Sequence, residues 1–286
     1  MGDDSKAQTR PTCLHALRQG LIDLAVLLRF FSRLALPALP FEDNPHGRPD
    51  FARAAPLLPL AGMILHAIGA LVLLVMLSLR LPPVIAAILA VAALTWSTGA
   101  FHEDGLADTA DGIGGGRNRD DKLAIMRDSR IGTYGTAALV FSLMLRVALL
   151  ASLVERSGAV AAILVLVASG GLSRVAALWL AVTLPPAHSD GAAFATGAPD
   201  MRRYLITAMI AIALSALLVL PVCGIIPFVA GLVGILLAGR AGAQLARRHL
   251  GGQTGDIAGA TQQASEIAFF LAVLVAIPFS NYTINI

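Results

Sequence analysis

Long apolar segments alternate with polar loops along this chain, and the apolar segments have the length of membrane spans. Seven windows consist almost entirely of hydrophobic and small residues: 57–79, 84–101, 133–154, 159–183, 204–220, 224–239 and 264–280. A helix needs roughly 20 apolar residues to cross the hydrocarbon core of a bilayer. The pattern therefore predicts an all-α fold, a polytopic membrane helical bundle with about seven transmembrane helices.

A further apolar segment, residues 21–39, differs from these windows. It is interrupted by three charged residues and a proline: Asp23, Arg29, Arg33 and Pro37. Charged side chains are unfavourable in the centre of a bilayer, so a full span is not expected there. We expect instead an N-terminal interfacial or re-entrant helix that lies at the membrane surface.

The composition supports a membrane protein and excludes several other classes. Of the 286 residues, 57% are hydrophobic and 14% are charged, whereas about a quarter of the residues in soluble domains are charged. The net charge of +3 fits a membrane protein with basic loops and gives no reason to expect a nucleic-acid partner. Cys13 and Cys223 are far apart and lack a CxxC or Cys/His context, which argues against a disulfide framework or a zinc site.

Basic residues fall almost entirely on one side of the predicted bundle. The N-terminal region and the segments 102–132, 184–203 and 240–263 contain 7, 5, 2 and 3 of the 21 lysines and arginines. The opposite loops contain only Arg80 and Arg156. Because cytoplasmic loops are enriched in Lys and Arg, we expect these segments in the cytoplasm, where they could build one site.

The polar segment 101–135 carries three aspartates at helical spacing. Asp104, Asp108 and Asp111 occupy positions i, i+4 and i+7 in FHEDGLADTADGIGGG, so a helix would place them on one face. Mg²⁺ prefers oxygen ligands and typically takes one or two carboxylates together with substrate phosphates and water. The spacing therefore predicts a Mg²⁺ site for a phosphate-bearing substrate. The alternative, a solvated charged loop, explains poorly why such an array lies between apolar segments.

Glycines and basic residues follow the aspartates. Gly114 and Gly115 belong to a flexible run whose amides could approach anionic oxygens. Five basic residues come next and could neutralise phosphates: Arg117, Arg119, Lys122, Arg127 and Arg130. Arg174 lies inside an apolar window, so it should face a carboxylate or phosphate, or else reach an interface. Arg146 has a weaker claim, because nothing polar surrounds it in the sequence.

A second carboxylate-bearing turn, GGQTGD, ends at Asp256. Asp256 could bind the metal or deprotonate an acceptor hydroxyl. Thr254 or Asp256 could also cap the N-terminus of the last helix, and these roles are compatible. His66 and His102 are interpreted as satisfied polar residues rather than metal ligands.

Three sequence blocks resemble the cobalamin synthase family, adenosylcobinamide-GDP ribazoletransferase. The blocks are HEDGLADTADG, MRDSRIGTYG and GGQTGDIAGA, in the order and spacing of that family. LSR at 172–174 and the segment FFSRLALPALP fit weaker features. The resemblance begins near residue 20, which leaves residues 1–20 as a polar N-terminal extension and residues 21–286 as a single integral membrane catalytic domain.

The resemblance implies a transferase of the bacterial inner membrane with its active site facing the cytoplasm. Such an enzyme joins adenosylcobinamide-GDP to α-ribazole or its 5′-phosphate, releases GMP and uses Mg²⁺. Glu103 stands where many members would have an apolar residue, so it is not expected to be an essential ligand. The predicted site residues are Asp256, Asp111 and Arg130 as catalytic groups; Lys122, Arg127, Arg174, Gly114 and Gly115 for phosphate binding; Asp128, Thr254 and Glu266 in support; and Asp104, Asp108 and Asp111 as metal ligands.

Two other functions stay open at this stage. CDP-alcohol phosphotransferases combine Asp-Gly with paired aspartates, but Ala107-Asp108 stands here where that family has Ala-Arg. A membrane transporter would carry its charged groups in broken helices at mid-membrane, whereas these acids cluster in loops on one face. Spans rich in Gly and Ala contact lipid and permit close helix packing or a homo-oligomer.

Overall fold

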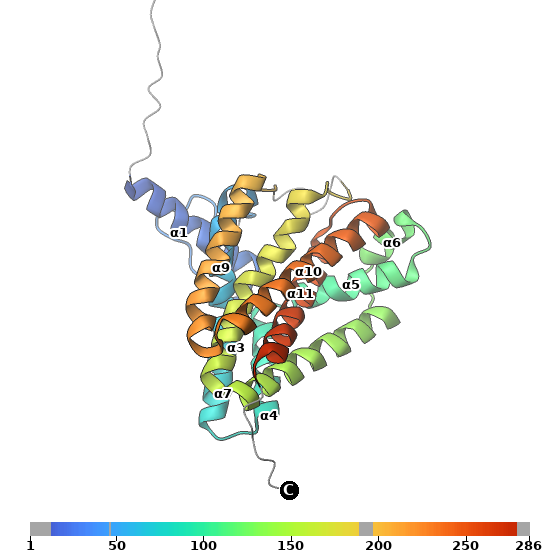
Figure 1. Ribbon diagram of the computed structural model, residues 1–286. Coiled ribbons are helices and arrows are strands. Elements are labelled where there is room, and N and C mark those ends of the chain that lie inside the picture. Colours follow the sequence, from blue (N-terminus) through green and yellow to red (C-terminus); the bar gives the residue numbers. More distant parts are fainter. Residues whose placement is uncertain (1–12, 46, 189–196, 279–286) are drawn as a thin grey trace, which may run out of the picture.

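The computed structural model describes residues 13–45, 47–188 and 197–278, and it confirms the predicted all-α class. Figure 1 shows the helices gathered in one bundle. The helices are α1 (Cys13–Phe30), α2 (Phe51–Ala54), the 3-10 helix η1 (Ala55–Leu57), α3 (Leu58–Ser78), α4 (Pro83–Ser97), α5 (Phe101–Gly115), α6 (Arg119–Met126), α7 (Thr133–Thr183), α9 (Met201–Cys223), α10 (Ile225–Leu250) and α11 (Gly255–Ala276).

Five helical segments in the described part of the chain are long and apolar enough to cross a membrane. They are Phe51–Ser78, Thr133–Thr183, Met201–Cys223, Ile225–Leu250 and Gly255–Ala276. The helices α4 and α5 meet at a bend of 88° and would add one broken span if they are counted as a pair. The prediction of about seven spans counted the two halves of α7 separately. A polytopic helical bundle is confirmed, and the number of spans stays a prediction.

The long helix α7 is divided at Gly158. A straight helix of 51 residues would extend about 75 Å, far more than the roughly 30 Å of a hydrocarbon core. Gly158 has φ 84°, a conformation that favours glycine, and the chain turns sharply there. In Figure 1 the two halves of α7 form a V whose point lies at the end of the bundle opposite α6.

Glycines allow the helices of the bundle to pack closely. A Cβ atom on Gly62 of α3 would overlap the carbonyl oxygen of Gly170 on α7. A Cβ atom on Gly242 of α10 would likewise overlap the hydroxyl of Thr261 on α11. The small residues thus serve packing within the chain, and self-association stays a prediction.

The polar segments of the chain meet at one end of the bundle. The amide of Gln253 donates to the carbonyl of Pro185 at 2.9 Å, and the amide of Ala187 donates to the carbonyl of Gln253 at 2.8 Å. Arg119 of α6 donates to the carbonyls of Leu250 and Ala187. In Figure 1, α1 and α6 also lie toward this end, whereas the α3–α4 and α9–α10 turns lie at the other. The expected convergence of the three polar segments is confirmed, and their orientation in a membrane stays a prediction.

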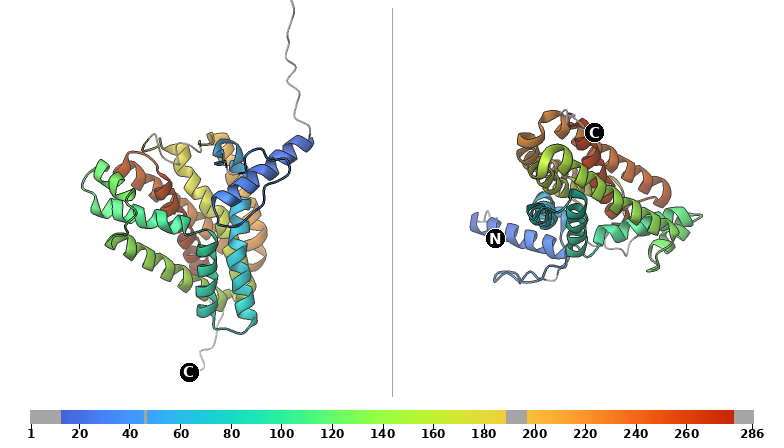
Figure 2. Two further views of the ribbon diagram at one scale, coloured as in Figure 1. Left: turned by 180° about the vertical axis from the view of Figure 1, so that it is seen from behind. Right: turned by 90° about the horizontal axis from the view of Figure 1, so that it is seen from below.

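The N-terminal helix differs from the expectation. Helix α1 begins at Cys13 and ends at Phe30, whereas a helix was predicted over residues 21–39. Beyond Phe30 the chain folds back as a loop, because Arg29 pairs with Glu42 at 2.6 Å and also donates to backbone carbonyls of this loop. The predicted boundary at residue 20 falls inside α1, while residues 1–12 lie outside the described part of the chain, and the division into an extension and a catalytic domain stays a prediction. Seen from below in Figure 2, α1 and the α5–α6 pair extend from opposite sides of the bundle.

Candidate active site

Helix α5 carries the three aspartates, and it is helical as the spacing predicted. It begins after the 88° bend, where Ala100 adopts φ 57°. Glu103 and Asp104 lie in its first turn, where negative charge is favourable because of the helix dipole. Gly105 packs directly on the last helix: a Cβ atom there would lie 2.8 Å from the carbonyl oxygen of Asp256. The first and third sequence blocks therefore meet at this contact.

The start of α11 places Asp256 beside α5. The hydroxyl of Thr254 accepts a hydrogen bond from the amide of Ile257 at 3.3 Å, so Thr254 is the N-cap of the helix. Gly251, with φ 66°, ends α10 just before this turn. Helix α11 begins at Gly255, directly after this cap, which is earlier than the start of the apolar window at residue 264. The predicted capping role of Thr254 is confirmed.

The carboxylates of Asp104, Asp108 and Asp256 form an acidic cluster. Helix α5 is not one of the five candidate spans. Burial and, to a lesser extent, the negative charges of Asp104, Asp256 and Asp111 together raise the pKa of Asp108 to about 7. Of the arginines near this region, Arg130 pairs with Asp128, and Arg146 pairs with Glu103 and Glu266. A cation would therefore relieve the repulsion within this cluster.

The cluster fits a metal ion that is shared with a substrate. Among the residues that the structure describes, no group of three or more His, Cys, Asp or Glu side chains is arranged to hold a metal by itself. Mg²⁺ commonly takes only one or two protein carboxylates and completes its shell with phosphate oxygens and water. Asp104 is exposed and Asp108 is half-buried, so both are open to such a shared ion.

Asp111 points toward α7. Its Oδ2 accepts a hydrogen bond from the amide of Gly132 at 2.6 Å, and its Oδ1 accepts one from the amide of Gly135 at 2.8 Å. A Cβ atom on either glycine would overlap the carboxylate. The charge also faces the N-terminus of α7, where the helix dipole stabilises it. Asp111 thus joins the first sequence block to the second, and its roles as metal ligand and catalytic group stay predictions.

Gly114 and Gly115 are in the last turn of α5 and do not form a flexible run. A Cβ atom on Gly114 would lie 2.6 Å from the ring of Tyr134, so a side chain is excluded by packing. Amides within a helix bond to carbonyls of the preceding turn. The prediction that Gly114 and Gly115 are flexible is therefore wrong, and their contact with phosphate stays a prediction.

The predicted basic residues are spread over the same end of the bundle. Lys122 Nζ lies 3.0 Å from Nδ1 of His249, which belongs to α10. Arg130 forms a bidentate pair with Asp128, with 2.6 Å between Nη2 and Oδ2, and lowers the pKa of Asp128 to about 2. Arg127 is the C-cap of α6. Their contacts with phosphate stay predictions.

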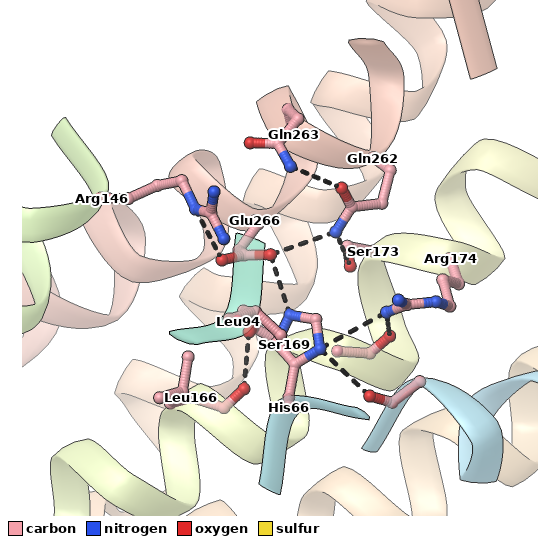
Figure 3. A network of polar contacts seen from close by, with 12 residues as sticks. His66, Leu94, Arg146, Leu166, Ser169, Ser173, Arg174, Gln262, Gln263 and Glu266 are labelled. Atoms are coloured by element: carbon pink, nitrogen blue, oxygen red, sulfur yellow. Dashed lines mark hydrogen bonds and ion pairs between the residues drawn. The ribbon is translucent and has the colours of Figure 1, made fainter. Parts of the chain in front are cut away.

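Glu266 is the centre of a buried polar network (Figure 3) whose hydrogen bonds connect α3, α5, α7 and α11. Its Oε1 accepts a hydrogen bond from Nε of Arg146 at 3.0 Å, and its Oε2 lies 3.0 Å from Nε2 of His66. Arg146 also donates to Glu103 of α5 at 2.8 Å. Gln262 donates to Glu266 at 3.1 Å. Arg146 and Glu266 are each only 1% exposed, so these contacts replace the water that charged groups otherwise need.

The interpretation of Arg146 as a weak candidate is wrong. Its partners Glu103 and Glu266 are 43 and 120 residues away in the sequence, so its neighbours in the chain gave no sign of them. The available signal was the arginine itself, because a cation inside an apolar window requires a partner. His66 is a satisfied core residue as interpreted, and Glu266 supports the bundle.

Arg174 is buried without the predicted carboxylate. Its Nη1 donates to the carbonyl of Gly170 at 2.9 Å and lies 3.4 Å from Nδ1 of His66. Its Cζ lies 5.4 Å from the centre of the Phe31 ring. Within the described part of the chain, Nε and Nη2 have no hydrogen-bond partner. A phosphate partner stays a prediction.

Comparison with known proteins identifies the family. The family model described as cobalamin-5-phosphate synthase matches residues 23–274. The chain belongs to the cobalamin-5-phosphate synthase family. Relatives named adenosylcobinamide-GDP ribazoletransferase include a protein of Azorhizobium caulinodans, 48% identical over 255 residues that cover 89% of this chain and 96% of the relative. A protein of Xanthobacter autotrophicus with that name is 49% identical over 253 residues, covering 88% and 96%. No solved structure matches the chain.

The family assignment confirms the resemblance and covers the whole candidate site. The matched residues 23–274 include the acidic cluster, Asp111 with its contacts to α7, and the buried network around Glu266. The same range includes α3, α5 and the main part of α11. In this member of the cobalamin-5-phosphate synthase family, the three sequence blocks that carried the resemblance lie together in space.

Proposed function

We propose that this protein is an adenosylcobinamide-GDP ribazoletransferase, the enzyme that completes the nucleotide loop of cobalamin. It joins adenosylcobinamide-GDP to α-ribazole or its 5′-phosphate and releases GMP. The observation that carries this function is the meeting of Asp104 and Asp108 with Asp256, in a chain 48% identical to a relative of that name.

In this reaction a hydroxyl of the acceptor attacks the phosphorus attached to cobinamide. A new O–P bond forms, the bond from that phosphorus to the bridging oxygen breaks, and GMP leaves with this oxygen. Asp104 and Asp108 would hold Mg²⁺, and the bound ion would supply positive charge for the diphosphate and for the departing GMP. Asp256 orients the acceptor hydroxyl and takes its proton, since a carboxylate within reach can act as a general base.

The surrounding residues bind and position the substrates. Lys122 and Arg127 lie at the same end of the bundle and supply positive charge for phosphate oxygens. Arg130 is exposed and can exchange Asp128 for a phosphate. The network from Glu103 to Glu266 fixes α5 against α11 and thereby holds the acidic cluster in place.

We propose further that the protein lies in the bacterial inner membrane with this site facing the cytoplasm. The support is the strong excess of lysine and arginine on the segments that meet around Arg119. A cysteine placed at Arg117 should react with an impermeant thiol reagent only after the membrane is opened. Labelling of intact cells at that position would contradict this orientation.

The activity is tested with full-length protein reconstituted in lipid. We expect GMP release only when adenosylcobinamide-GDP, the acceptor and Mg²⁺ are all present. Asp256→Asn should release GMP about 100-fold more slowly or worse, whereas Glu155→Gln, an exposed acid next to the break in α7, should match the unaltered protein. Transport of a substrate without GMP release, or a fully active Asp256→Asn, would contradict the proposal.

A further inference from the structure

A cavity lies beside the acidic cluster, between helices α1, α3, α5, α7 and α11. Its volume is about 110 Å³, several times the roughly 10–15 Å³ that one water needs. Its wall is predominantly aromatic and aliphatic, and its aromatic residues are Phe30, Phe31, Phe51, Phe101 and His102. Such a wall favours a flat apolar ring, which can contact aromatic faces and edges.

One side of this cavity is formed by Arg174, whose side chain is incompletely satisfied. Arg174 is 2% exposed, and its Nε and Nη2 donate to no group in the described ranges. The ring of Phe31 contacts both Arg174 and His102: its centre is 5.4 Å from the guanidinium carbon, and it is stacked on His102 at 5.7 Å. An unpaired buried donor is unfavourable, so a ligand with one acceptor atom would satisfy it.

The cavity also adjoins the proposed site of reaction. Gly255 lines it and directly precedes Asp256, and Phe101 lines it one turn before Gly105, which packs on Asp256. A group held in the cavity would therefore have its attachment point next to the acidic cluster.

We propose that this cavity binds the heterocyclic base of the acceptor nucleoside. The inference rests on the proposed function, in which the acceptor is the nucleoside of an azole. The ring lies among the phenylalanines, its free ring nitrogen accepts a hydrogen bond from Arg174, and the ribose points toward Asp256. The wall is apolar apart from Arg174, His102 and Gln253, so a guanine base would leave polar groups unpaired, and a phosphate would lose its hydration there.

The test compares two acceptor nucleosides that differ at one atom. In the second, the free ring nitrogen is replaced by C–H, so the acceptor of the hydrogen bond is lost. Binding of each to full-length protein, without the cobinamide substrate, is measured by calorimetry. We expect the unaltered protein to prefer the azole nucleoside about tenfold, and Arg174→Lys to lose this preference, because one hydrogen bond of about 1.4 kcal/mol corresponds to that ratio.

A second variant covers the case in which Arg174→Lys does not fold. Phe101 is 40% exposed, and Phe101→Leu should raise the KM for the acceptor about tenfold through lost ring contact. The KM for adenosylcobinamide-GDP should stay within about twofold of that of the unaltered protein. Phe141→Leu is the matched control, since Phe141 is 65% exposed and does not line the cavity.

The outcomes separate this inference from the proposed function. An unchanged acceptor KM in Phe101→Leu, with normal GMP release by the unaltered protein, overturns the base site and leaves the function intact. A rise in the KM for adenosylcobinamide-GDP alone also overturns it, because the cavity would then hold the guanine base. If no substrate pair yields GMP but azole nucleosides still bind through Arg174, the function fails and the base site stands.

Discussion

Arg146 on α7 donates to the carboxylate of Glu103 on α5 across 2.8 Å, and both side chains are almost completely buried. The same guanidinium reaches Glu266 on α11 at 3.0 Å. One cation therefore joins the helix that carries Asp104 to the helix that carries Asp256. The geometry of the acidic cluster depends on this contact inside the bundle.

Loss of Arg146 should strongly destabilise the protein. In Arg146→Met, two buried carboxylates lose their shared cation, and breaking a buried ion pair costs about 3–5 kcal/mol. Thermal unfolding in detergent measures the change. Arg240→Met removes an exposed arginine and should have little effect. Equal unfolding temperatures for the two variants would show that the network does not stabilise the bundle.

Asp111 and Asp108 should differ in what they affect. Asp111→Asn weakens the contact with the amides of Gly132 and Gly135, so we expect a loss of about 1.5–3 kcal/mol in stability with little change in the Mg²⁺ concentration required. Asp108→Asn should retain stability and require more Mg²⁺. Titration of GMP release against Mg²⁺, together with unfolding curves, separates the two roles. A shifted Mg²⁺ requirement in Asp111→Asn would instead support the prediction that Asp111 is a metal ligand.

Two glycines of α5 should respond in opposite ways to alanine. Gly105→Ala places a methyl group 2.8 Å from the Asp256 carbonyl oxygen, so it should separate α5 from α11 and lower GMP release. In Gly115→Ala the added methyl group would lie 3.4 Å from Ile125, which is an ordinary contact. This variant should be as active as the unaltered protein and up to about 1 kcal/mol more stable, because alanine has a higher helix propensity than glycine. Loss of phosphate-dependent binding in Gly115→Ala would instead support the flexible cradle.

The binding of Mg²⁺ should depend on pH through Asp108. In the metal-free protein the pKa of this carboxyl is raised to about 7, so below that pH a proton competes with the metal. Apparent Mg²⁺ affinity should therefore rise as the pH increases to about 7 and then level off. Without metal, the stability of the protein should change in the opposite direction and fall as the pH rises. The stabilising contribution of Asp108 is fully present below its unfolded pKa of about 3.9 and is lost as the pH rises through about 7. Unfolding temperatures with and without Mg²⁺ across this range measure both effects, and Asp108→Asn should remove the contribution of this carboxyl to the pH dependence.

The fold class followed from the sequence because apolar length and helical spacing are local properties. The windows 57–79 and 204–220 matched α3 and α9 closely, and the aspartate spacing correctly predicted that α5 is a helix. The extent of α1 was wrong, because the end of that helix depends on Arg29 pairing with Glu42 in the following loop. Such a contact has no local sequence signal.

The site could be predicted only in part, for a similar reason. The acids were identified by type and spacing, but the direction of each carboxylate depends on tertiary contacts. Asp111 bonds the amides of a helix that begins at Thr133, whereas Asp256 arrives beside Asp108 from the far end of the chain. The roles of Gly114 and Arg146 were missed because they depend on contacts between distant parts of the chain. Gly114 packs on the ring of Tyr134, and Arg146 binds Glu103 and Glu266.

The central claim is that Asp104 and Asp108 act with Asp256 on one metal-bound diphosphate. The most direct measurement is the rate of Mg²⁺-dependent GMP release by Asp104→Asn, Asp256→Asn and the double variant, each shown to be folded. We predict that each single variant loses about 100-fold or more, and that the double variant loses little beyond the worse single variant, because groups that act as a unit are not additive. A folded Asp104→Asn protein that releases GMP at the full rate would contradict the account.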